Sequence, residues 1–185
     1  MKKYLILFSI LTLFVNIYPA EYTKKDFKDF RLKMKIPNTL NAMDSGGYYD
    51  IYFADESGNL EFIFNCTDYS ESKADFSEYS EDNQQTILEF AQSDVENAYY
   101  AFNIKFDKCE FIELNDRTCL TLNYSGVLSD KYKSDTLYAD YIQAVEYQIL
   151  KYGLLYNFVV VKYYSEFDKE ELKIVNEMLE SIVLY

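Results

Sequence analysis

The sequence contains no histidine, and this absence limits the catalytic chemistry that it can support. Ser-His-Asp catalysis, Cys-His catalysis and the commonest zinc ligand all require an imidazole. Ser70 and Lys73 have the spacing of a serine–lysine acyl-transfer site, but they lie in a polar linker and the companion motifs of that chemistry are missing. No glycine-rich phosphate-binding motif occurs, and the chain has only 5 glycines. We therefore expect no cofactor.

Paired carboxylates are the remaining route to catalysis, because glycosidases use two such groups at a fixed separation. Six acids lie on two adjacent hairpins: Asp107, Glu110, Glu113, Asp116, Asp140 and Glu146. Solvated strand faces explain most of them, since sugar-binding platforms are usually rich in tryptophan and this chain has none. Glu146 is the exception. It lies among Ala144, Gln148 and Val159, and we expect it to be partly buried with a raised pKa.

Residues 55–59 (Asp-Glu-Ser-Gly-Asn) form an acidic turn that could bind calcium. The spacing of an EF-hand loop is missing, however, and a plain hairpin turn accounts for the same residues. We therefore predict no metal site.

Tyrosine is the unusual component of this sequence, with 20 residues. Exposed tyrosine offers rigid contact area with a polar tip, which suits protein recognition. The candidate partner-binding residues lie on or beside one long hairpin: Tyr138, Tyr141, Tyr147, Tyr156 and Tyr164. Strand propensity and a compositional bias of the genome explain the same enrichment without a binding role.

Residues 1–20 have the pattern of a secretory signal peptide: two lysines, an apolar stretch over residues 4–15, and Pro19-Ala20 before Glu21. The apolar stretch is short for a membrane span. Bulky Tyr18 is a poor residue for the cleavage site, so an uncleaved anchor is the alternative. With cleavage, we expect an exported protein, periplasmic or secreted, that has no stable membrane insertion.

Removing residues 1–20 takes away two lysines and no acid, which leaves 16 basic and 31 acidic residues and a net charge of −15. Such a field repels phosphate backbones, so we expect no nucleic-acid partner. An acidic surface that merely keeps an exported protein soluble explains the same charge.

The three cysteines leave at least one thiol without an intramolecular partner. A two-residue turn at Asn115-Asp116 would pair Cys119 with Ile112 and Cys109 with Leu122, which places the two sulfurs on opposite faces of the sheet. We therefore predict no disulfide between Cys109 and Cys119.

Residues 137–164 predict two long strands joined by a turn at Tyr152-Gly153, because glycine supplies the positive φ of a tight reversal. That turn would pair Ile149 with Tyr156. The second strand, residues 154–161, is apolar on both faces apart from Asn157. Both faces of its sheet should therefore be covered, which makes it a central strand.

The other elements are predicted in chain order. Residues 24–29 form a charged lead-in, and strands follow at 30–36, 48–54 and 60–66. Residues 67–80 form a polar linker or lid, a helix spans about 82–102, and strands at 104–114 and 117–125 form a hairpin. A last helix spans 168–181 after a capping box at Asp168 and Glu171. We expect residues 21–185 to be one α+β domain: a largely antiparallel sheet with helices on both faces.

This order resembles the PsbP-like family. The residues that carry the resemblance are FRLKMKIP at 30–37, the helix before the 104–125 hairpin, the long hairpin, and LESIV at 179–183. Thr39-Leu40 stand where the family usually has an aromatic residue soon after the proline. The resemblance implies an α-β-α sandwich and a role in binding rather than catalysis.

Three functions remain open at this point. The first is a non-catalytic binding or accessory module of the bacterial cell envelope, whose partner is another envelope protein. The alternative is a carboxylate-dependent hydrolase of a glycan or other neutral substrate. The third is a divalent-cation site in the acidic turns.

Overall fold

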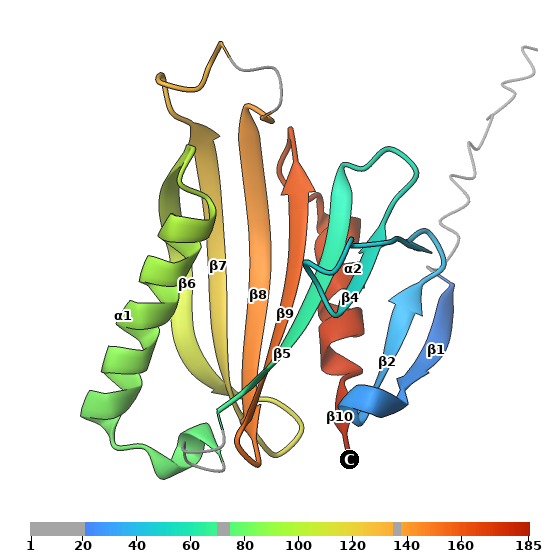
Figure 1. Cartoon of the computed structure of the whole chain (residues 1–185), viewed down its shortest axis with the longest axis vertical. Coiled ribbons are helices and arrows are strands. Elements are labelled where there is room, and N and C mark those ends of the chain that lie inside the picture. The colour runs from blue at the N-terminus through green and yellow to red at the C-terminus, as the bar shows by residue number, and fades with distance from the viewer. Residues whose placement is uncertain (1–20, 70–74, 135–137) are drawn as a thin grey trace, which may run out of the picture.

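The computed structural model describes residues 21–69, 75–134 and 138–185. Within these residues the chain forms two antiparallel sheets and two α-helices (Figure 1). The predicted signal peptide and the Ser70–Lys73 pair lie outside the described residues. None of the described helices is both long and apolar enough to cross a membrane.

The large sheet has seven strands in the order β3-β4-β5-β9-β8-β7-β6. These strands are β3 (Asn41–Ala42), β4 (Ile51–Ala54), β5 (Leu60–Asp68), β6 (Phe102–Glu113), β7 (Thr118–Leu128), β8 (Tyr141–Lys151) and β9 (Leu154–Tyr163). β9 lies between β5 and β8, so the prediction of a central strand at 154–161 is confirmed.

Both predicted hairpin registers are confirmed. Tyr152 and Gly153 have φ values of 53° and 76°, the left-handed geometry that a two-residue turn requires. Ile149 pairs with Tyr156 as a result. The turn at Asn115-Asp116 has the same geometry and pairs Cys119 with Ile112. Cys109 and Cys119 belong to different hydrophobic clusters, which agrees with the predicted placement of their sulfurs on opposite faces of the sheet.

A second, small sheet was not predicted. Residues 24–29 are not a lead-in, because most of them belong to β1 (Tyr22–Phe27). β1 pairs with β2 (Leu32–Pro37), and β2 pairs with β10 (Val183–Leu184) near the C-terminus. The strand predicted at 30–36 therefore exists but joins a separate sheet. Its alternating pattern shows which side is buried and gives no information on the neighbouring strand.

Both helices begin at a side-chain cap, and the cap of the second helix is the predicted one. α1 (Glu81–Ala98) starts after Ser80, whose hydroxyl accepts a hydrogen bond from the Asn83 backbone. α2 (Lys169–Glu180) starts after Asp168 with the predicted capping box to Glu171. α1 ends four residues earlier than predicted, because Phe102 already belongs to β6.

The core consists of two hydrophobic clusters, and successive residues along a strand of the large sheet belong to one cluster and then to the other. Phe158 and Val160 belong to the cluster that contains Val175 and Leu179 of α2. Their neighbour Val159 belongs to the cluster that contains Val95 of α1. In Figure 1, α1 lies beside β6 and β7, and β8, β9 and β5 continue the sheet beyond it.

Candidate functional site

Polar residues interrupt the α1 face of the large sheet along one row. Gln148 on β8 pairs with Asn157 on β9, and Asn157 pairs with Asn65 on β5. Glu146 lies two residues from Gln148 and therefore on the same face. The residues around this row are mostly apolar, among them Ile63 and Val159. Three amides and a carboxyl group are thus gathered in the middle of the sheet by strand register alone.

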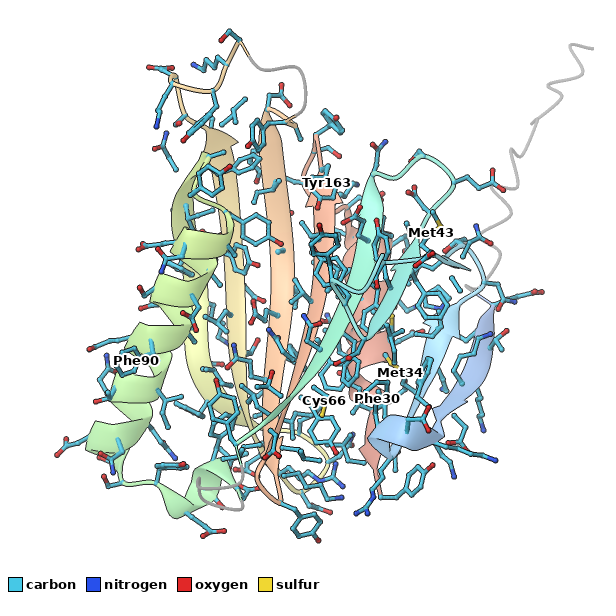
Figure 2. The ribbon with its side chains drawn as sticks, viewed as in Figure 1. Phe30, Met34, Met43, Cys66, Phe90 and Tyr163 are labelled. Atoms are coloured by element: carbon cyan, nitrogen blue, oxygen red, sulfur yellow. The ribbon has the colours of Figure 1, made fainter. Side chains whose placement is uncertain are left out.

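This polar row lies in an open pocket with a volume of about 880 Å³. Its floor comes from β5, β7, β8 and β9, and its walls come from α1 and the segments around Tyr49 and Tyr79. Figure 2 marks three of its lining residues: Phe90 on α1, Cys66 on β5 and Tyr163 on β9. A pocket of this size falls within the range of small-molecule sites.

Tyrosine is the commonest residue of the pocket lining. Seven tyrosines contribute: Tyr48, Tyr49, Tyr69, Tyr79, Tyr99, Tyr124 and Tyr163. They range from Tyr48, which is 84% exposed, to Tyr124, which is 1% exposed. Aromatic rings therefore line the pocket from its mouth to its floor.

Glu146 is the buried carboxyl group of the pocket, with 4% of its surface exposed. The Gln148 side chain donates a hydrogen bond to it at 2.8 Å. Burial raises the pKa of Glu146, and Asp94 across the pocket raises it further, whereas the polar groups of Gln148, Asn157 and Tyr124 act in the opposite direction. The direction of the pKa shift of Glu146 agrees with the prediction, and the residue is more deeply buried than the partial burial predicted.

Two buried polar atoms in the pocket have no hydrogen-bond partner. They are the Tyr124 hydroxyl and the Asn157 side-chain oxygen. Burial raises the pKa of Tyr124 well above its ordinary value, and Tyr99 and Glu146, which lie near its hydroxyl and interact with it, raise it further. Unpartnered buried polar groups are rare in folded proteins and call for an explanation.

One wall of the pocket is held by a second carboxylate. Glu61 accepts hydrogen bonds from the hydroxyls of Tyr52, at 2.6 Å, and Tyr163, at 2.9 Å. The Tyr49 ring packs against Tyr52 with 5.7 Å between ring centroids. This network links strand β4, strand β5 and the end of β9, and it fixes the orientation of the Tyr163 ring that faces the pocket.

The predicted partner-binding tyrosines do not form one surface. Tyr156 is 2% exposed and packs against Phe64, so it is a core residue rather than an exposed contact. Tyr147 is half-buried on the same side, the side of α2. Tyr138 and Tyr164 both line a smaller pocket of about 370 Å³, which adjoins the main pocket and shares Tyr99 and Tyr163 with it. Tyr141 is half-buried, and its carbonyl accepts from the Tyr164 backbone.

Three of the other acids considered in the sequence are solvated strand or turn residues, as the following contacts show. Asp107 and Glu110 form exposed ion pairs with Lys105 and Lys108. Asp55 closes a plain hairpin turn by accepting from the Asn59 backbone. The described residues contain no group of three or more acidic or cysteine side chains placed to hold a metal ion.

The sequence singled out Glu146 as a buried carboxyl group and Asn157 as the break in an apolar strand, but it did not predict that Gln148, Asn157 and the surrounding tyrosines form one site. Tyr49, Tyr99 and Tyr124 come from three separate segments, and their convergence follows from the tertiary position of α1. The pairing of Gln148 with Asn157, which the turn at Tyr152-Gly153 implies, was the available signal.

No protein-family model matches the sequence, and a search of curated proteins gives no match. Solved structures do resemble the chain. Cyanobacterial PsbP (CyanoP) from Synechocystis sp. PCC 6803 has a TM-score of 0.66 at 12% identity, and the match covers 92% of this chain and 96% of that one. The Saccharomyces cerevisiae Ran-binding protein Mog1p has a TM-score of 0.60 at 10% identity, with 89% and 96% covered. The chain therefore has the predicted PsbP-like fold.

Proposed function

We propose that the protein is a non-catalytic binding module of the bacterial cell envelope, and that its binding site is the pocket over β5, β8 and β9. It acts as one domain, residues 21–185, with α1 and α2 on opposite faces of the large sheet. Export relies on residues 1–20. The partner is another envelope protein, which inserts a side chain or a short segment into the pocket.

The observation that carries this proposal is the combination of an open aromatic pocket with unpartnered polar atoms inside it. A structural core would replace the Tyr124 hydroxyl by an apolar group, because a buried hydroxyl without a partner costs stability. A binding site retains such atoms for its ligand. Mog1p, which has a similar fold, is described as Ran-binding, and this supports a role in protein binding.

The proposal is tested by capture of a partner from envelope extract with the exported protein and three variants. Tyr49→Ala removes an aromatic wall of the pocket, and Tyr152→Ala removes an exposed tyrosine at a hairpin tip outside it. Tyr141→Ala combined with Tyr164→Ala removes the predicted contacts at the sheet end. Loss of a specific partner with Tyr49→Ala, but not with Tyr152→Ala, supports the proposal. Equal capture by all four proteins contradicts the pocket as the site.

One observation favours the hydrolase as a second candidate. Glu146 combines burial and a raised pKa with access to an open pocket, as a general acid requires, and Asp94 lines the same pocket. Turnover of a neutral glycoside that Glu146→Gln abolishes would establish this function. Absence of turnover across a glycoside panel, with binding retained, would leave the binding module.

A further inference from the structure

The charges of the pocket all have one sign. Asp50, Asp94 and Glu146 contribute carboxyl groups, and no lysine or arginine is among its lining residues in the described part of the chain. Asp50 is held in place, because its carboxylate accepts from the Cys66 backbone at 2.7 Å. An anionic ligand would meet the exposed carboxylates of Asp50 and Asp94, and the buried carboxyl group of Glu146, without a counterion. The pocket therefore selects against anions.

The aromatic lining adds a second feature of the same kind. Tyrosine rings carry negative charge on their faces, and several rings around one cavity attract an ammonium or guanidinium group. Tyr99 and Tyr124 lie with 5.8 Å between ring centroids, and Tyr49 and Tyr163 both lie near Glu61, with Tyr163 close to Tyr99 as well. Tyrosine rings from the residue after α1, from β7, from β9 and from the segment before β4 thus line the same pocket as the polar row.

The unpartnered atoms agree with a ligand that donates hydrogen bonds. The Asn157 oxygen is an acceptor, and the Tyr124 hydroxyl can act as one. One oxygen of Glu146 accepts a hydrogen bond from the Gln148 side-chain amide. A cation that also carries an N–H or O–H donor would satisfy these atoms.

We propose that the pocket binds an organic cation, an ammonium or guanidinium group, which the tyrosine rings enclose and the carboxyl groups of Asp50, Asp94 and Glu146 neutralise. This inference rests on the proposed binding function and specifies its ligand. Two sources share this chemistry: a free amine, and a lysine or arginine side chain of a partner protein.

The test compares choline with its uncharged isostere 3,3-dimethylbutan-1-ol by isothermal titration calorimetry at low salt. The two molecules have nearly the same shape, so a difference in affinity reports the charge. We expect choline to bind at least about 10-fold more tightly, as a desolvated cation–π contact implies. Added salt should weaken choline binding and leave the isostere unaffected.

Two variants of α1 give a matched comparison. Asp94→Asn removes a charge that lines the pocket, and Glu96→Gln removes a charge two residues away on the same helix that does not. We expect choline affinity to fall by about 3- to 10-fold in the first variant, because a charge near the bound cation is lost. It should stay unchanged in the second variant, because Glu96 does not line the pocket.

The outcomes separate the two proposals. If the isostere or benzoate binds as tightly as choline and Tyr49→Ala weakens that binding, the site is real but the cation proposal is wrong. If no probe binds and no protein partner is captured, the binding function fails as well. To determine whether the cation is a free molecule or a side chain of a partner, Nα-acetyl-lysine amide, which keeps its charged side chain, and a lysine-containing peptide are titrated in parallel. Tighter binding of the peptide assigns the cation to a partner protein, and tighter binding of choline assigns it to a free amine.

Discussion

The Tyr124 hydroxyl should destabilise the protein when no ligand is present. It is buried, with 1% of the side chain exposed, and it has no hydrogen-bond partner. A buried hydroxyl without a partner costs about 1–3 kcal/mol. Tyr124→Phe removes the hydroxyl and keeps the ring, so it creates almost no cavity. We therefore expect this variant to raise the free energy of unfolding by about 1 kcal/mol or more.

Tyr52→Phe is the matched control, because it also removes a tyrosine hydroxyl, but one that has a hydrogen-bond partner. Tyr52 donates to Glu61 at 2.6 Å in a half-buried position. Loss of this bond should lower the free energy of unfolding by about 1 kcal/mol. The two substitutions are chemically identical, and the structure predicts changes of opposite sign.

Thermal and urea unfolding of the three proteins at neutral pH measure this difference. A change of 1 kcal/mol shifts the Tm by about 2–4 °C for a chain of this size. Tyr124→Phe should therefore melt higher than the wild type, and Tyr52→Phe lower. If Tyr124→Phe is destabilised as much as Tyr52→Phe, the hydroxyl has a partner in solution, such as Glu146 or a water molecule, and the reasoning fails. Weaker choline binding by the more stable Tyr124→Phe would link the lost stability to function.

Three further predictions follow from single residues. Burial raises the pKa of Glu146 above its ordinary value of 4.5, so its ionisation destabilises the fold as the pH rises from that value to the folded pKa; Glu146→Gln should remove this loss, which Tm measured against pH will show. Gly126→Ala would place a Cβ 2.8 Å from a side chain of β6, and we expect a loss of about 1–3 kcal/mol in urea unfolding. Burial raises the pKa of all three cysteines, to about 12 for Cys119, which is buried, whereas Cys66 and Cys109 are partly exposed; a thiol reagent at pH 8 should therefore label Cys66 and Cys109 slowly in the native protein, and all three cysteines only in denaturant without reductant.

The registers of the two hairpins could be predicted because two residues decide each of them. Tyr152-Gly153 and Asn115-Asp116 both adopt the left-handed turn, and every pairing along β8–β9 then follows by counting. The central position of β9 could be predicted for a similar reason. Its residues are apolar on both faces, and only a covered strand tolerates that composition.

The small sheet and the pocket walls could not be predicted in this way. β2 pairs with β10, about 150 residues away in the sequence, and no local pattern specifies such a partner. The grouping of the pocket tyrosines could not be predicted for the same reason. Tyr49 precedes β4, Tyr99 follows α1 and Tyr124 lies on β7, so their meeting depends on where α1 rests against the sheet.

The polar row is where the local and the tertiary information meet. Asn157 is the residue that breaks the apolar pattern of β9, and the register places it between Gln148 and Asn65. Natural sequences follow the rules of local pattern and core packing except where function requires otherwise. Here the exception extends across three neighbouring strands, ends at a buried carboxyl group, and opens into a cavity without a positive charge among its described lining residues. A packing defect would be confined to one position, whereas a row that is aligned across strands and exposed to a cavity has the arrangement of a binding site.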